Sequence, residues 1–162
     1  LCVWDDVGAD LDFGLARDMS LNNMYVRTLA ARDLLDNAAS AKRWDAVDLS
    51  KKAASLRRGE ARWALTRDTT VYGFALWWEC RLLEGISLST SPLAPKSHWE
   101  QLYCPVREPV AAHAGDELAI ALTSDSRFEV GASVKWEISL RSKKTGKVSH
   151  QALDIKHGDI AG

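Results

Sequence analysis

The feature that most constrains the fold is a period-two alternation of apolar and polar residues in the second half of the chain. In Ser133–Arg141, valine, tryptophan, isoleucine and leucine occupy every second position, with polar residues between them. Side chains of a strand point alternately to its two faces, so this pattern predicts a strand with one buried face. Glu117–Leu122 alternates in the same way after the turn signal Ala-Gly-Asp. Lys143–Lys147 predicts a hairpin turn that leads into a further strand from Val148.

A third alternating run, Phe74–Leu82, predicts another half-buried strand. The residues expected on its buried face are Phe74, Leu76, Trp78, Cys80 and Leu82. Several short strands separated by turns predict a mainly β fold, an antiparallel β-barrel or sandwich.

The stretch from Ser20 to Glu60 has a different character, because it has no proline and no glycine before Gly59. Leu21, Tyr25 and Leu29 approximate a helical stripe after Ser20, which is a suitable N-cap. We therefore expect one or two helices over residues 20–60, inserted near the N-terminus of the β fold. They could pack on their own domain or form an arm that reaches a second subunit, and periodicity alone favours the first interpretation.

Composition excludes some classes of function. The 162 residues carry a net charge of −1, which argues against broad electrostatic binding to nucleic acid or to an anionic membrane. No apolar run reaches transmembrane length. The three cysteines are odd in number and widely spaced, which argues against a disulfide framework or zinc site and favours a cytoplasmic location. The first residue is leucine, which is compatible with a fragment of a longer protein.

Motifs for metal binding, nucleophilic catalysis and phosphate binding are missing from the sequence. The four histidines form no HxH or HExxH pattern, and neither GxSxG nor a glycine-rich phosphate loop occurs. The best candidate site is the stretch Ser97–Gln101, which follows a proline-stiffened loop. His98 can exchange hydrogen bonds, and Trp99 offers an aromatic face to a cation such as a guanidinium. The alternative, favoured by composition alone, places Trp99 in the core and makes His98 an ordinary loop histidine.

The order of motifs between Val71 and Leu122 resembles the C-terminal barrel of the protein arginine N-methyltransferase family. In that family a strand reading Gly-Phe-x-x-Trp-Phe/Trp is followed by Leu/Phe-Ser-Thr-Ser-Pro and then by x-x-Pro-x-Thr-His-Trp-x-Gln. The matching residues here are Gly73, Phe74, Trp77–Trp78, Leu88–Pro92, Pro95, Ser97–Trp99, Gln101 and Gly115–Asp116. The segment from Val3 to Phe13 is similar to the junction between the family's cofactor-binding domain and its barrel.

The resemblance implies a single barrel domain over residues 1–162, with residues 20–60 as the family's dimerisation arm. This reverses the preference left by periodicity. Family members bind S-adenosylmethionine in a preceding domain, whose glycine-rich loop and paired glutamates are absent from these residues. We therefore expect no cofactor in this chain, S-adenosylmethionine in the parent protein, and no catalysis by the chain alone. The expected partners are an arginine-containing protein or peptide substrate and, in the parent, a second copy in a homodimer.

The resemblance also assigns roles to the candidate site. The family's Thr-His-Trp loop enters the active site and shapes the arginine pocket, which makes His98 and Trp99 the expected catalytic residues. Ser97, Glu100 and Gln101 are expected to bind substrate. Ser97 replaces the family threonine but keeps its hydroxyl, and Glu100 stands where many members have a basic residue.

Two alternatives use the same residues without methyl transfer. The chain could be a stand-alone binding module that holds a peptide or protein partner with its tryptophans. It could also be a carbohydrate-binding β-domain, which would need exposed, coplanar aromatic rings.

Overall fold

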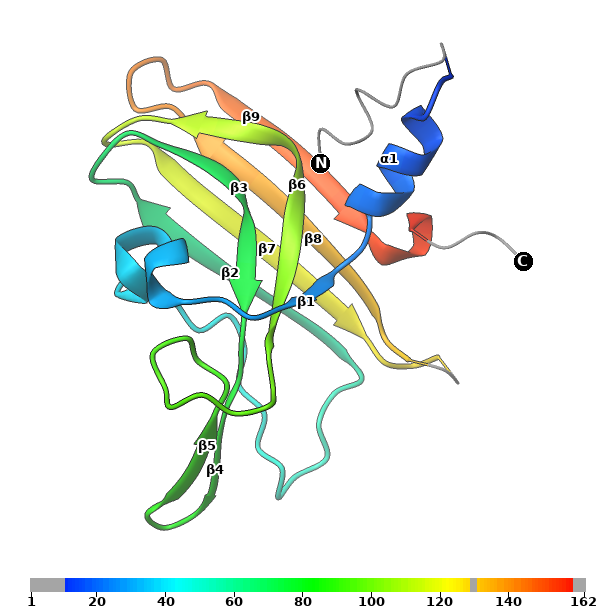
Figure 1. The fold of residues 1–162 in the computed structure, drawn as a ribbon, viewed down its shortest axis with the longest axis vertical. Coiled ribbons are helices and arrows are strands. Elements are labelled where there is room, and N and C mark those ends of the chain that lie inside the picture. Colours follow the sequence, from blue (N-terminus) through cyan, green and yellow to red (C-terminus); the bar gives the residue numbers. More distant parts are fainter. Residues whose placement is uncertain (1–10, 129–130, 159–162) are drawn as a thin grey trace.

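The computed structural model describes residues 11–128 and 131–158, and this part of the chain forms two antiparallel sheets that pack face to face (Figure 1). One sheet has the strand order β1-β6-β3 and the other β2-β7-β8-β9, while β4 and β5 form a separate hairpin. The mainly β, antiparallel fold is confirmed in its sandwich form, since no sheet closes on itself within the described residues. The segment that resembles the domain junction lies mostly outside them.

Most elements follow one another with short connections, and the longest connections are residues 39–55 before β2 and residues 90–100 before β6. The strands are β1 Tyr25–Arg27, β2 Leu56–Ala64, β3 Thr69–Leu76, β4 Glu79–Leu83, β5 Ile86–Ser89, β6 Gln101–Ala112, β7 Glu117–Asp125, β8 Ser133–Arg141 and β9 Val148–Asp154. The helical elements are α1 Gly14–Leu21 and the short 3-10 turns η2 Ala31–Asp33, η3 Leu35–Ala38 and η4 Ile155–His157. No helix in the described ranges is long and apolar enough to cross a membrane.

Trp136 of β8 lies in the core between the two sheets. Its side chain is 0% exposed, and its indole Nε1 donates a hydrogen bond of 2.7 Å to the carbonyl oxygen of Pro105 in β6. A buried indole N–H is costly without such an acceptor, so this bond ties one sheet to the other. The predicted strand Ser133–Arg141 coincides with β8, and its alternate apolar residues pack in the core as expected.

The single strand predicted over Phe74–Leu82 is wrong, because β3 ends at Leu76 and β4 begins at Glu79. From there the chain pairs with β5 instead of β6, in a hairpin that stands away from the sandwich (Figure 1). Leu82 is consequently 52% exposed. The alternation of residues is the same for a half-buried strand and for a hairpin that nothing covers, so the pattern could not distinguish them.

The helix predicted over residues 20–60 is also wrong, because α1 ends at Leu21 and is the only α-helix of the described residues. The side-chain amides of Asn22 and Asn23 each donate a hydrogen bond of 2.9 Å to the carbonyl oxygen four residues earlier. They thereby satisfy acceptors of the last helical turn and end the helix. The next residues, Tyr25–Arg27, pair with the start of β6.

The segment after η3 runs as an irregular chain along β2. Within η3 itself, Asp36–Ala38 all have positive φ, which is incompatible with a right-handed helix that continues into this segment. The backbone of Trp44 approaches Gly59 so closely that a Cβ there would come within 1.9 Å of the Trp44 carbonyl oxygen. Arg57 binds the Asp45 carboxylate through two nitrogens, each at 2.5 Å. These tertiary contacts replace the helical bonds that propensity alone would favour.

Two ion pairs fix α1 to the sandwich. The Arg17 guanidinium lies 2.7 Å from a Glu108 carboxylate oxygen, and the Arg107 guanidinium lies 2.5 Å from an Asp18 carboxylate oxygen. Each element contributes one cation and one anion, so the two pairs together hold the helix at one position along β6.

Candidate functional site at the loop before β6

The loop between β5 and β6 is anchored at both ends by buried polar side chains. Gln101, 7% exposed, donates from Nε2 to the Thr90 carbonyl oxygen at 2.7 Å and accepts at Oε1 from the Leu29 N–H at 2.8 Å. Thr90 in turn binds both backbone groups of Trp78: its N–H donates to the Trp78 carbonyl oxygen at 3.0 Å, and its hydroxyl accepts from the Trp78 N–H at 3.1 Å. We call these four residues the clasp. Gln101, predicted to bind substrate, has both ends of its amide engaged in this clasp.

Ser97, His98 and Trp99 lie together in the exposed part of the loop. The Ser97 hydroxyl oxygen accepts a hydrogen bond of 3.1 Å from the Trp99 N–H, which forms a local turn. The His98 ring stands edge-on to the Trp99 ring, with centroids 5.9 Å apart. Trp99 is 48% exposed, so the alternative that it belongs to the core is wrong.

Glu100 is held from the segment that follows β1. Its carboxylate oxygen accepts a hydrogen bond from the Thr28 hydroxyl. The carboxylate is thereby fixed directly after the His98–Trp99 pair, and both residues of the Thr28–Glu100 contact are exposed. A carboxylate and an aromatic face are two groups that bind a guanidinium, the first by charge-assisted hydrogen bonds and the second by cation–π attraction. The loop therefore presents, on neighbouring residues, two of the groups that can bind such a cation.

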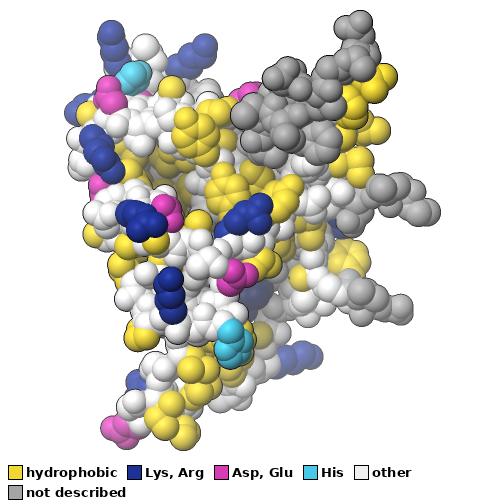
Figure 2. All heavy atoms as spheres, viewed as in Figure 1, with side chains coloured by type: hydrophobic (Ala, Val, Ile, Leu, Met, Phe, Trp, Pro, Cys, Tyr) yellow, Lys and Arg dark blue, Asp and Glu magenta, His cyan; other side chains and the backbone are white. Residues whose placement is uncertain are grey.

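A large apolar surface continues from the loop onto the β4–β5 hairpin, where hydrophobic side chains gather at the bottom of the view in Figure 2. Its exposed large residues are Trp78, Leu82, Leu83, Ile86, Leu88, Leu93 and Trp99. Single exposed hydrophobic residues are ordinary, but a cluster of this kind usually marks a contact surface. We call these seven residues the apolar end.

Trp78 and Thr90 belong to the candidate site by their contacts, although the sequence did not single them out as site residues. Trp78 was assigned to a buried strand face, yet it is 43% exposed and its ring centroid lies 4.9 Å from that of Trp99. Thr90 entered only as part of the Ser-Thr-Ser-Pro match. The sequence signal for both was the order of motifs, in which the tryptophan pair precedes that segment, and not the alternation of residues.

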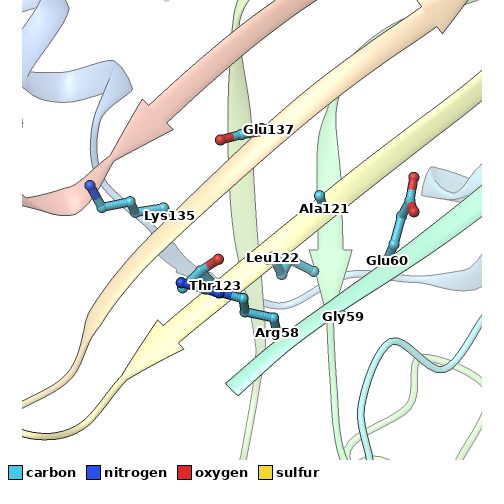
Figure 3. A pocket seen from close by; sticks show the side chains of 8 residues that line it. All are labelled: Arg58, Gly59, Glu60, Ala121, Leu122, Thr123, Lys135 and Glu137. Atoms are coloured by element: carbon cyan, nitrogen blue, oxygen red, sulfur yellow. The ribbon is translucent and has the colours of Figure 1, made fainter. Parts of the chain in front are cut away.

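The groove in Figure 3, with a volume of about 360 Å³, is a separate feature on the outer face of the β2-β7-β8-β9 sheet. Arg58, Glu60, Lys135 and Glu137 rise on its two sides, and Ala121 lies between them. Basic and acidic side chains are mixed, so the groove does not favour a ligand of one charge. No group of three or more potential metal ligands occurs among the described residues.

Comparison with known proteins agrees with the motif order. Residues 1–144 match the family model described as "Arginine methyltransferase oligomerization subdomain". Most of the chain is covered by this match, and the chain belongs to this family.

Relatives of known activity are methyltransferases, and the chain spans only a minor part of their length. An arginine N(omega)-methyltransferase of Streptomyces achromogenes subsp. streptozoticus is 42% identical over 78 residues, which cover 47% of this chain and 22% of the relative. Human protein arginine N-methyltransferase 2 is 26% identical over 142 residues, covering 81% of this chain and 33% of the relative. A histone-arginine methyltransferase of Anopheles gambiae is 31% identical over 93 residues, or 54% of this chain and 14% of the relative.

A solved structure shows the same fold at low sequence identity. It is a chain of the "Trypanosoma brucei PRMT1 enzyme-prozyme heterotetrameric complex with AdoHcy", with a TM-score of 0.70 and 16% identity over 94% of this chain and 49% of that chain. This likeness concerns the fold.

Proposed function

We propose that this chain is the part of an arginine methyltransferase that presents the substrate and mediates oligomerisation. The observation that carries the proposal is the placement of His98 and Trp99, both exposed on a loop whose two ends are held by the buried side chains of Thr90 and Gln101. A loop that is held at both ends and carries an exposed aromatic face and a fixed carboxylate is suited to form one side of an arginine pocket.

In this proposal Trp99 covers one face of the substrate guanidinium, and His98 exchanges hydrogen bonds at the rim of the pocket. Glu100 attracts the cation, and Ser97 keeps the Trp99 backbone in place. S-adenosylmethionine would supply the methyl group when bound to the parent protein, and no residue of this chain is assigned to it. The chain alone is then inactive, because the carboxylates that aim the guanidinium at the methyl donor come from outside it.

The apolar end supports completion of the pocket by another protein surface. Its β4–β5 hairpin lies beside the loop and exposes several large apolar side chains. Exposure of this kind is typical of a surface that another protein covers. A homodimer of the parent is part of the same proposal, with residues 20–60 as its arm although they form no long helix, and with α1 ending at their start. Leu11, just before α1, and Leu15 on it are 65% and 76% exposed, respectively, and are available for a contact between subunits. We further propose a cytoplasmic location, with Cys80 and Cys104 as free thiols.

A second candidate substrate is free arginine. The relative that is 42% identical is named for methylation of arginine and not of a protein. Both substrates present the same guanidinium to the loop, so they are distinguished by assay and not by the residues described above. The remaining alternative is a stand-alone module that binds a peptide through its exposed tryptophans.

The deciding experiment is methyl transfer by the parent protein to an arginine peptide and to free arginine, with variants His98→Ala and Trp99→Ala. We expect each variant to lower kcat/KM by at least about tenfold, since each removes a contact to the reacting group. Lys96→Ala is the matched control, because Lys96 is exposed in the same loop and has no assigned role. Full activity in both site variants would refute the proposed roles.

A further inference from the structure

We propose that Trp78 is the positioning residue for Trp99, and that the two rings act as one unit at the rim of the site. The meaning of this pair for substrate binding rests on the proposed function, whereas the pair itself rests on geometry alone. Their ring centroids are 4.9 Å apart with an interplanar angle of 50°, which is a tilted aromatic contact.

The orientation of Trp99 is not fixed by its own loop. Ser97 holds the Trp99 backbone, but the indole projects from an exposed segment and is itself half exposed. Within the described residues, the aromatic rings that contact it are those of Trp78 and His98, and His98 is exposed in the same loop. A bulky exposed side chain without a fixed neighbour populates several rotamers.

Trp78, by contrast, starts from a fixed point. Its N–H and carbonyl are both bonded to Thr90, which is 3% exposed, and Thr90 is bonded to the buried Gln101. The Trp78 backbone therefore cannot move without breaking the clasp. Thr90 stands at the beginning of the loop and holds the Trp78 backbone there. Through the ring contact, Trp78 then sets the position of the Trp99 ring near the end of the loop.

The pair has a consequence for recognition. Trp78 packs against the Trp99 ring, so a cation is received by the part of the ring that stays exposed. A guanidinium stacked there meets a ring that is already oriented, and less conformational entropy is lost on binding. Without Trp78, the Trp99 side chain regains its freedom to change rotamers. We therefore expect Trp78→Ala to raise KM for an arginine peptide about fivefold while changing kcat less.

The first test uses this 162-residue chain labelled with 5-fluorotryptophan and observed by ¹⁹F NMR. The Trp99 resonance, assigned by Trp99→Phe, should carry a ring-current shift from Trp78. In Trp78→Ala it should move towards its position in the unfolded chain and become narrower, and Trp78→Phe should restore most of the shift. Trp77→Phe is the matched control, because among the described residues Trp77 makes no ring contact with Trp99. An unchanged Trp99 resonance in Trp78→Ala would overturn the inference.

The buried Trp136 reports whether each variant is folded. If its resonance is lost in Trp78→Ala, the reciprocal variant Trp99→Ala decides, since that residue is exposed and its removal spares the clasp. The Trp78 resonance must then shift, and its failure to do so would also overturn the inference.

Methyl transfer by the parent protein separates the two proposals. If Trp99→Ala impairs transfer and Trp78→Ala leaves KM unchanged, the positioning role is wrong and the proposed function stands. If neither Trp99→Ala nor His98→Ala impairs transfer, the proposed function is wrong, and the NMR result still decides whether the ring pair exists.

Discussion

The two ends of the molecule differ in how far their side chains find partners within the fold. At the end where β6 turns into β7, Asp116 is buried and its carboxylate joins two turns by backbone hydrogen bonds. At the other end, the β4–β5 hairpin leaves the sandwich and exposes leucine and isoleucine side chains. At the Asp116 end, the buried polar group finds its hydrogen-bond partners within the sandwich. At the apolar end, the exposed side chains fit the proposed contact with another protein surface.

The largest effect is expected in the core between the sheets. Trp136→Ala removes a fully buried ring and its hydrogen bond to the Pro105 carbonyl, so the free energy of unfolding should fall by about 3–5 kcal/mol. Urea denaturation followed by circular dichroism measures this change. A loss below about 1 kcal/mol would mean that the two sheets are not joined through this residue.

A smaller and pH-dependent effect is expected at Asp116. The N–H groups of His113 and Lys143 donate to its carboxylate, each at 2.9 Å, and they hold the pKa of Asp116 below its ordinary value of 3.8. A lowered pKa stabilises the folded state above pH 3.8, and this contribution is lost as the pH falls through the folded-state pKa. Asp116→Asn should therefore lower Tm by a few degrees at neutral pH.

The difference between Asp116→Asn and the wild type should narrow as the pH is lowered below about 3.8. Thermal melts of the two proteins across this range provide the measurement. A difference in Tm that stays constant with pH would show that the carboxylate charge is not what stabilises the turn.

The smallest effect on stability is expected at the apolar end. Leu83 is 67% exposed, so Leu83→Ser should change the free energy of unfolding by no more than about 0.5 kcal/mol. The same substitution at Leu122, which is 2% exposed, is the matched control and should be strongly destabilising. Leu83→Ser should nevertheless reduce binding of a hydrophobic dye and any self-association of the chain. A large loss of stability at Leu83 would mean that the hairpin belongs to the folding core.

What the sequence could predict depended on how local the signal was. β8 was predicted with its full bounds, because Ser133–Arg141 is an uninterrupted alternation between two turns. The split at Trp77–Trp78 could not be predicted, since it depends on hydrogen bonds to Thr90 across the hairpin. The residues 20–60 contain acceptable helix formers, but the Leu29 N–H is bonded to the distant Gln101, and the backbone of Trp44 packs closely against Gly59 of β2.

The candidate site was predicted in part. The order of motifs identified Ser97–Gln101, and the structure places these residues in and directly after one loop. The sequence could not indicate that Gln101 faces inward and Glu100 outward, because that difference arises where the loop enters β6. The contact between Trp78 and Trp99 joins residues 21 positions apart and has no local signature.

The strand order also bears on how the chain acquires its structure. β7, β8 and β9 follow one another in sequence, so their pairing closes small loops. The pairing of β1 with β6 instead joins Tyr25 to Tyr103, which is far away in the sequence. Loop closure is slower for distant partners. The three-stranded meander should therefore form early in refolding and the sheet that bears the candidate site late. Substitutions in the β7–β8 hairpin should slow folding, and those around β1 should mainly accelerate unfolding.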